Sequence, residues 1–78
     1  MTDIDNRVFT VIGGVFGVEP EELSRDMVAD DVDGWDSLSH VTVILMLSQE
    51  FGVKISPTET EGIDNIGALI DLIKTKIS

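Results

Sequence analysis

Ser37 is the side chain of this sequence best placed to take part in covalent chemistry. It follows Asp36, a good residue to cap the N-terminus of a helix, because a carboxylate accepts hydrogen bonds from the first backbone N–H groups. The amides and the dipole of such a helix start also favour a phosphate ester. The plainer interpretation is a polar residue in the first helical turn, and helix geometry alone does not decide between the two.

Catalysis by Ser37 is not expected. His40 would share its side of a helix, but a serine hydrolase also needs a group that orients the histidine and an oxyanion hole. No nucleophile-elbow pattern surrounds the serine, and we interpret His40 as an ordinary surface or boundary residue. The chain has no cysteine, so a thioester would need sulfur from an attached group. We therefore expect no catalytic residue and no enzyme activity.

A cluster of aspartates precedes the serine. Its members are Asp30, Asp31, Asp33 and Asp36. An EF-hand calcium loop places acids at alternating positions before a glycine, and a glutamate further on closes the site. With Gly34 as that glycine, the first ligand position holds Ala29 and the last holds His40. We therefore predict no specific metal site, only loose binding of divalent cations to an acidic surface.

The net charge limits the classes of partner. Fifteen acidic residues stand against five basic ones, giving a formal net charge of −10 at pH 7. No basic patch is available to displace counterions from nucleic acid, so nucleic acid is a poor partner. A polyanion attracts basic protein surfaces and speeds their encounter, although acidity also serves solubility alone.

The length of 78 residues suits one domain, 1–78, with a thin core. No apolar run approaches the ~20 residues that span a membrane, so membrane insertion is not expected. No signal peptide is visible at the acidic start of the chain. We expect a monomeric cytoplasmic protein.

Three long segments have apolar residues at helical spacing. The first helix is expected to contain the apolar stripe from Ile4 to Val15, with Thr2 as its cap and Gly17 as its stop. The second is expected over residues 37–51, and a following glycine would end it. The last is expected to start at a cap on Asp64 or Asn65. These helices would position the serine at the start of the second one.

The segments between these helices complete the predicted fold. Residues 56–59 (Ser-Pro-Thr-Glu) are typical of a capping box with proline at the first helical position, and Gly62 would keep that helix short. The connection over residues 18–35, with a single turn near its start, is long enough to suggest a functional role. Three apolar residues are expected to hold it to the core: Met27, Val28 and Val32. We predict an all-α fold, a small four-helix bundle of three longer helices and one short helix.

The second helix is apolar on too many sides to be buried all round in a domain of this size. One stripe, expected to face the core, contains Val41, Ile44, Leu47 and Phe51, with Val43 beside it. Leu38, Leu45 and Met46 fall largely on other sides. An exposed apolar patch often marks a contact surface, so we interpret these residues as a docking patch, unless the long connection covers them.

Residues 34–38, Gly-Trp-Asp-Ser-Leu, resemble the phosphopantetheine attachment motif of acyl carrier proteins, whose core is Asp-Ser-Leu. The tripeptide alone is a weak signal, but its surroundings also resemble that family. Residues 51–55 resemble the end of the family's second helix, and residues 16–23 resemble the exit of its first. Ile63 and residues 66–70 resemble the passage to its last helix. The resemblance covers essentially the whole chain.

The resemblance implies a carrier domain of acyl carrier type. A phosphopantetheinyl transferase, using coenzyme A and magnesium, would attach the phosphopantetheine arm to Ser37, and the thiol of the arm would carry acyl groups. Acyl-loading and acyl-processing enzymes with basic docking surfaces are the implied partners. The expected partner contacts are Asp36, Leu38, Ser39, Thr42, Leu45, Met46 and Ile63. The expected lining of an acyl-chain site is Val43, Ile44, Leu47, Ile63 and Leu69.

The second helix departs from the family pattern. Carriers of primary fatty acid synthesis usually have an acid directly after the leucine and several more along this helix. Here those places hold Ser39, Thr42, Ser48 and Gln49. The departure favours a specialised carrier, of polyketide or modified-lipid type, over a general fatty acid carrier. Two other interpretations stay open: an aminoacyl or peptidyl carrier, and an unmodified acidic helical interaction module.

Overall fold

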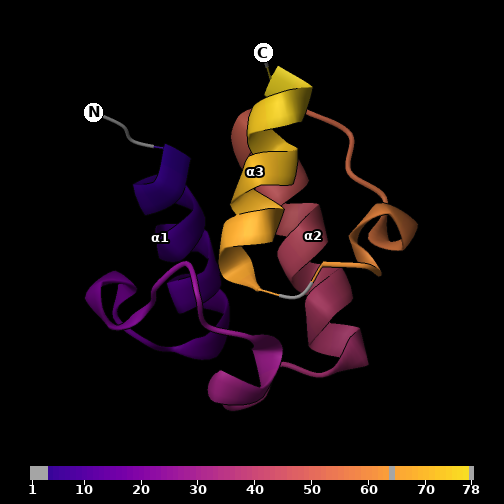
Figure 1. Ribbon diagram of the computed structural model, residues 1–78. Helices are drawn as coiled ribbons and strands as arrows, with labels where there is room; N and C mark the ends of the chain where they lie inside the picture. The colour runs from indigo at the N-terminus through magenta and orange to yellow at the C-terminus, as the bar shows by residue number, and fades with distance from the viewer. Residues whose placement is uncertain (1–3, 64, 78) are drawn as a thin grey trace.

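The computed structural model describes residues 4–63 and 65–77, and in that part of the chain three α-helices and no strand are found. Helix α1 covers Ile4–Phe16, α2 covers Ser37–Phe51 and α3 covers Ile66–Ile77. Figure 1 shows the helices gathered into one bundle, with the connection from α1 to α2 along its lower edge. The all-α prediction is confirmed. The predicted cap Thr2 lies outside the described residues.

One apolar cluster holds the three helices together. Its buried members are Val8, Ile12, Leu23, Val32, Val43, Ile44, Leu47, Ile55, Ile66, Leu69, Ile70 and Ile73. Each buried aliphatic side chain of this size contributes about 1.5–3 kcal/mol from removal of apolar surface from water. The chain turns closely over the end of α1, where Gly13 is buried and a Cβ there would collide with the carbonyl oxygen of Val18. Glycine is therefore required inside this helix, despite its low helix propensity.

The bounds of α2 agree with those predicted from the sequence. Gly52 ends the helix in a left-handed conformation with φ 64°, and its N–H donates to the carbonyl oxygen of Ser48. The prediction for its buried face is corrected at one position, because Val41 is 41% exposed. At 100° per residue, the face that carries Val43 and Leu47 is centred near His40, and Val41 falls at its edge.

The connection between α1 and α2 contains two 3-10 turns, η1 at Pro20–Glu22 and η2 at Ala29–Asp31. The first was predicted as a single turn, whereas the second was not predicted. Val32 is buried and Met27 is half-buried, as expected of residues that hold the connection to the core. Val28 was wrongly placed with them, since it is exposed and its N–H donates to the carboxylate of Asp31 instead.

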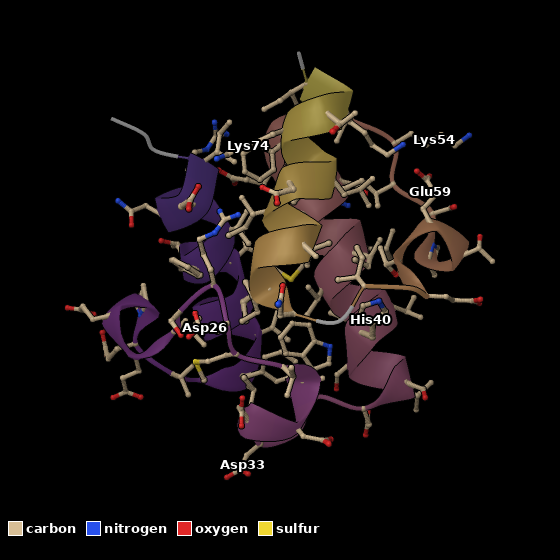
Figure 2. All side chains as sticks on the ribbon, in the orientation of Figure 1. Asp26, Asp33, His40, Lys54, Glu59 and Lys74 are labelled. Carbon is tan, nitrogen blue, oxygen red and sulfur yellow. The ribbon has the colours of Figure 1, made fainter. Side chains whose placement is uncertain are left out.

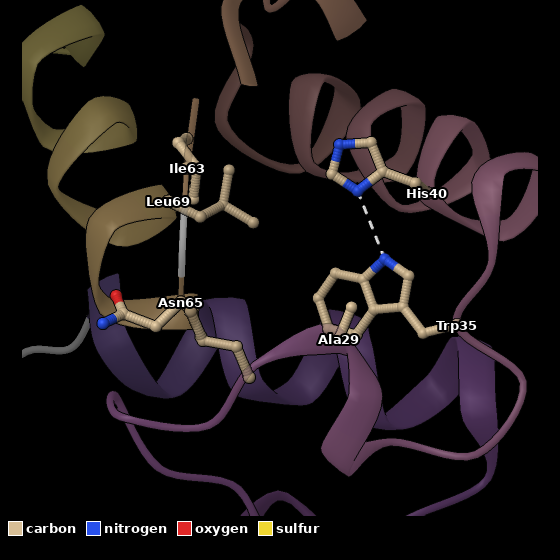
Figure 3. A pocket seen from close by; sticks show the side chains of 7 residues that line it. Ala29, Trp35, His40, Ile63, Asn65 and Leu69 are labelled. Atoms are coloured by element: carbon tan, nitrogen blue, oxygen red, sulfur yellow. Dashed lines mark hydrogen bonds between the residues drawn. The ribbon is translucent and has the colours of Figure 1, made fainter. Parts of the chain in front are cut away.

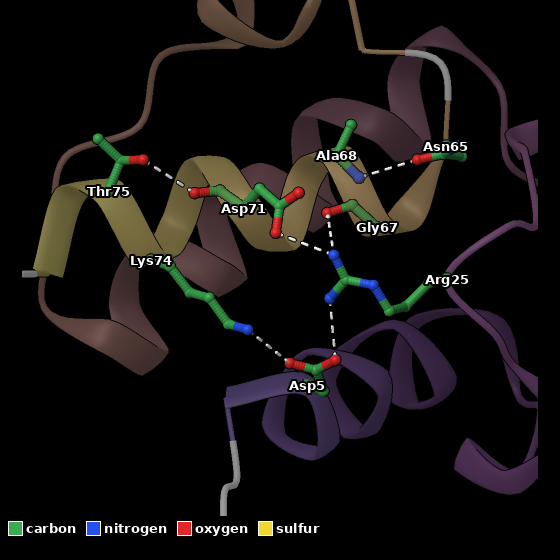
Figure 4. A network of polar contacts seen from close by, with 8 residues as sticks. All are labelled: Asp5, Arg25, Asn65, Gly67, Ala68, Asp71, Lys74 and Thr75. Carbon is green, nitrogen blue, oxygen red and sulfur yellow. Dashed lines mark hydrogen bonds and ion pairs between the residues drawn. The ribbon is translucent and has the colours of Figure 1, made fainter.

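Arg25 fastens the middle of this connection to two helices (Figure 4). Its guanidinium contacts Asp5 of α1 at 2.9 Å and Asp71 of α3 at 2.9 Å. Lys74 lies 3.3 Å from the same Asp5 carboxylate. Burial raises the pKa of Asp5, but the hydrogen bonds and charges of Arg25 and Lys74 outweigh it and hold that pKa below its ordinary value.

The free backbone N–H groups at the start of α3 are hydrogen-bonded by the side chain of Asn65 and by carbonyl groups of the connection. The side chain of Asn65 accepts from the N–H of Ala68 at 2.8 Å, so Asn65 is an N-cap, as predicted; Asp64, the other candidate, lies outside the described residues. The N–H groups of Ile66 and Gly67 donate to carbonyl oxygens of the connection, at 3.0 and 2.8 Å. The connection therefore supplies acceptors that a helix start otherwise lacks.

The predicted fourth helix is only a 3-10 turn, η3, at Pro57–Thr60. The carboxylate of Glu59 accepts from the N–H of Ser56 at 3.1 Å, in the manner of a capping box. The hydroxyl of Thr60 donates to the carbonyl of Pro57 within this turn, and Gly62, a weak helix former, follows two residues after its end. The bundle is therefore corrected to three α-helices and a 3-10 turn.

Charged side chains lie mostly on the outside of the bundle. Figure 2 shows Asp33 extending away from the connection. Among residues 4–63 and 65–77, no three His, Asp or Glu side chains converge as ligands for a metal ion. The described helices include none that is long and apolar enough to cross a membrane.

Candidate functional site

Ser37 is the first residue of α2 and is exposed. The preceding Asp36 caps the helix, because its Oδ1 accepts from the N–H of Ser39 at 2.9 Å and its carbonyl accepts from the N–H of His40 at 2.8 Å. The Ser39 N–H holds the pKa of Asp36 below its ordinary value, so the carboxylate is charged at neutral pH. A negative charge thus stands directly beside an accessible serine hydroxyl.

An open groove of about 550 Å³ begins at Ser37. It lies between the end of the connection, the first turns of α2 and η3. Its lining residues are Ala29, Trp35, Asp36, Ser37, His40, Val41, Pro57, Thr60, Glu61 and Ile63. A long flexible group on the serine would therefore find a surface to lie along, with two acidic residues, Asp36 and Glu61, among mostly apolar ones.

A small cavity of about 50 Å³ lies deeper than the groove. Its lining residues are Ala29, Trp35, His40, Ile63, Asn65, Ile66 and Leu69. Figure 3 shows Ile63 and Leu69 on one side of this cavity, with Trp35 and His40 on the other. The cavity is predominantly apolar and reaches the N-terminal end of α3.

His40 is held by hydrogen bonds on both ring nitrogens. The indole N–H of Trp35 donates to its Nδ1 at 3.2 Å, and its Nε2 lies 2.6 Å from the hydroxyl of Thr60. That hydroxyl in turn donates to the carbonyl of Pro57 at 2.7 Å. The ring of Trp35 also stacks on Phe16 at the end of α1, with centroids 5.2 Å apart. These contacts join four segments of the chain at one place.

The hydrogen bonds from Trp35 through His40 to Thr60 determine the protonation state of His40. An indole nitrogen can only donate, so Nδ1 must be a bare acceptor. The single hydroxyl proton of Thr60 goes to Pro57, so the Thr60 oxygen accepts from Nε2–H. The imidazole is therefore neutral, with its proton on Nε2. Burial lowers the pKa of His40, in agreement with the neutral form.

The model of the family described as "Phosphopantetheine attachment site" matches residues 6–73. The chain belongs to this family. Proteins of this class carry phosphopantetheine, derived from coenzyme A, as a covalent cofactor and act as carriers. The family membership is consistent with the resemblance to acyl carrier proteins.

The residues of this carrier fit such a cofactor. An exposed hydroxyl at a helix start is accessible to a modifying enzyme, and the groove beside it has room for an extended arm. Ser37 would hold the phosphate, and the groove walls at Val41 and Ile63 would contact the arm. When bound, the cofactor supplies the thiol that the protein lacks.

The expected docking residues of the carrier form an exposed face of α2. Leu38 is 82% exposed and Leu45 is 57% exposed, with Met46 and Thr42 also exposed and Ser39 half-buried. Apart from its cap Asp36 this helix has a single acid, Glu50. That acid is paired, since its carboxylate contacts Arg7 at 2.9 Å. The face is apolar and neutral. The last expected contact, Ile63, lies apart from this face, in the wall of the groove.

The expected lining of an acyl-chain site is divided by the structure. Ile63 and Leu69 line the small cavity. Val43, Ile44 and Leu47 are buried in the main core and line neither the groove nor the cavity.

Sequence reasoning missed the group formed by Trp35, His40 and Thr60. Its partners are far apart in the chain, since His40 and Thr60 are separated by 20 positions. One signal was present, because His40 falls in the middle of the face that α2 buries. A polar residue at such a position requires hydrogen-bond partners.

Proposed function

We propose that this carrier is an acyl carrier protein, with the arm attached to Ser37 and acyl groups carried on its thiol between enzymes of fatty acid, lipid or polyketide biosynthesis. The exposed Ser37 hydroxyl, which lines a groove of about 550 Å³ together with apolar residues such as Val41 and Ile63, supports this most directly. The Asp-Ser-Leu motif lies within the residues that match the family.

Attachment proceeds by attack of the Ser37 oxygen on the phosphate of coenzyme A that bears the pantetheine. A serine–phosphate ester bond forms, the phosphoanhydride bond breaks, and adenosine bisphosphate leaves. A phosphopantetheinyl transferase and its magnesium supply the charge stabilisation for this step. The contribution of the carrier is to present the hydroxyl on a rigid helix end.

The neutral face of α2 supports a specialised carrier. Enzymes that recognise an acidic α2 would meet Ser39, Thr42, Ser48 and Gln49 instead. The acids of this protein are concentrated in the connection, so a basic surface of a partner would contact that segment and the cap at Asp36. We expect the domain, 1–78, to act without catalysis of its own, as a monomer in the cytoplasm, where coenzyme A is available.

Mass spectrometry tests the attachment site. Incubation with coenzyme A, magnesium and a broad-range transferase should add one arm to the wild type and none to Ser37→Ala. Ser24→Ala is the matched control, because it removes an exposed hydroxyl that lies outside the expected partner contacts and should leave modification intact. Peptide mapping locates the arm. Modification of Ser37→Ala, or failure of the wild type to be modified, would refute the assignment.

A further inference from the structure

The groove beside Ser37 and the deeper cavity are separated by a shared wall. Four residues line both hollows: Ala29, Trp35, His40 and Ile63. Movement of the aromatic members of this wall would join the two spaces into one continuous path from the serine to the interior of the bundle.

The cavity in its present form is too small for a long apolar cargo. A cavity of about 150 Å³ holds a benzene ring, whereas this one measures about 50 Å³. Its walls are nonetheless suited to an alkyl chain, since Ile63, Ile66 and Leu69 line it. Entry of more than a very short chain requires the wall to open.

The wall is closed by hydrogen bonds and not by packing alone. Trp35 comes from the end of the connection, His40 from α2 and Thr60 from η3, and their bonds measure 3.2 Å and 2.6 Å. We propose that these three residues form a latch between groove and cavity, and that protonation of His40 releases its Trp35 side and admits an apolar cargo. The latch controls cargo entry only if Ser37 carries the arm, so it rests on the proposed function.

The hydrogen-bond chemistry explains why protonation would open the latch. A second ring proton on Nδ1 would point at the indole N–H of Trp35, and two donors cannot bond to each other. The bond from Nε2–H to Thr60 is unaffected, because that nitrogen already carries a proton. Protonation therefore breaks one side of the latch and keeps the ring tethered on the other.

The surroundings of His40 set the direction in which a charged ring would move. The charged residues that line the groove are Asp36, at the cap of α2, and Glu61, after η3. The neighbours of the latch on the other elements are uncharged: Phe16 on α1, Ala29 in η2, and Ile66 and Leu69 on α3. A cation is favoured near the carboxylates and opposed by the apolar side, so the charged ring is drawn toward the groove and away from Trp35.

Spectroscopy on the unmodified protein tests the latch without any cargo. Trp35 is the only tryptophan, the chain has no tyrosine, and His40 is the only histidine. Between about pH 8 and about pH 5, the range in which histidines titrate, we expect a change in tryptophan emission whose midpoint equals that of the His40 ring signals in NMR. His40→Gln should abolish the emission change. An emission curve that is flat in the wild type, or unchanged in His40→Gln, would overturn the latch.

Removal of one partner at a time separates the latch from a merely structural role. Trp35→Phe keeps an aromatic ring but removes the N–H that opposes protonation, so the pKa of His40 should rise. Thr60→Val keeps the shape of the side chain but removes an acceptor that favours the cation, so the pKa should fall. A His40 pKa that is unchanged in Trp35→Phe would contradict the proposal.

A third test measures whether protonation of His40 is coupled to entry of the acyl chain. If protonation and an alkyl chain both favour the open latch, each must promote the other. The pKa of His40 should therefore shift upward when Ser37 carries an octanoyl arm, and should stay unchanged with an acetyl arm. Mass spectrometry verifies loading in each sample. Failure to load Ser37 refutes the proposed function, whereas loading with equal pKa values in the two forms refutes the latch.

Discussion

The backbone N–H of Ser39 donates to Oδ1 of Asp36 at 2.9 Å, so the carboxylate beside Ser37 is fixed on the start of α2. The cap and the charge that we propose for partner recognition are therefore one side chain. Its two roles can be separated, because asparagine caps a helix about as well as aspartate but has no charge.

Asp36→Asn should fold with near wild-type stability and be modified more slowly by a transferase with a basic docking surface. Asp36→Ala should lose both the cap and the charge, and should melt at a lower temperature. Thermal melting and the initial rate of arm transfer give the two readouts. Equal modification rates for wild type and Asp36→Asn would show that the charge has no role in recognition.

Arg25→Met should destabilise the fold by detaching the connection from α1 and α3. The variant keeps much of the aliphatic stem but loses the contacts with Asp5 and Asp71. The melting temperature should fall by several degrees, and high salt should reduce the difference because these ion pairs are partly exposed. The matched control is Lys54→Met, since the described part of the chain shows no ion pair at Lys54. A similar loss in both variants would exclude a specific role for Arg25.

Acid should loosen η3 through Glu59. Its contact with Lys76, at 2.6 Å, holds the pKa of Glu59 below its ordinary value. The unfolded chain then binds more protons than the folded one, so this stabilisation is full above the ordinary glutamate pKa of about 4.3 and is lost as pH falls through the lowered value. Urea unfolding at neutral and acid pH measures it. Glu59→Gln should be less stable than wild type at neutral pH, and the two should converge in acid.

Two added acids on α2 should make this carrier a better substrate for ketosynthases of primary fatty acid synthesis. Each ion pair at an exposed rim contributes about 0.2–1 kcal/mol, so Ser39→Asp with Gln49→Glu should raise kcat/KM by about 2-fold to 30-fold. Asn6→Asp with Thr10→Asp adds the same charge on α1, at two exposed positions, and should have little effect. Wild-type turnover equal to that of a general carrier would contradict the specialised role.

Ile63→Phe should prevent the bundle from stabilising a medium-length acyl chain. Ile63 lines both the groove and the cavity, so a larger ring would occupy the path. In the wild type an octanoyl form should melt above an acetyl form, because burial contributes about 0.8 kcal/mol for each methylene. In Ile63→Phe that difference should vanish, with a cost of about 1–3 kcal/mol from overpacking. Equal melting of the wild-type forms would place the chain in solvent.

The bounds of α2 could be predicted from local sequence, because Asp36 is a favoured N-cap residue and Gly52 is a favoured residue for ending a helix. It failed at Val41, which was assigned to the core stripe because it is apolar. The centre of that face belongs to the polar His40, whose partners are supplied by the connection and η3. Periodicity cannot reveal such partners, since they depend on tertiary contacts.

The second 3-10 turn and the contacts of Arg25 were unpredictable for the same reason. Residues 29–31 contain no residue type that strongly predicts a turn. In the sequence, Arg25 is a single basic residue in an acidic segment, and nothing indicates its partners. Its two acidic partners lie 20 and 46 residues away in the chain. Family resemblance predicted the attachment motif, but not the latch, because the latch depends on side chains of this particular sequence.

The amide of Gly67 at the start of α3 donates to the carbonyl of Arg25, 42 residues earlier. This amide and that of Ile66 can exchange their hydrogens with solvent only when the connection lifts away, so fraying of α3 and release of the connection are one cooperative opening. During folding the same bonds require closure of a long loop. The first turn of α3 should therefore be among the last parts of the backbone to become protected, although the rest of that helix lies in the core.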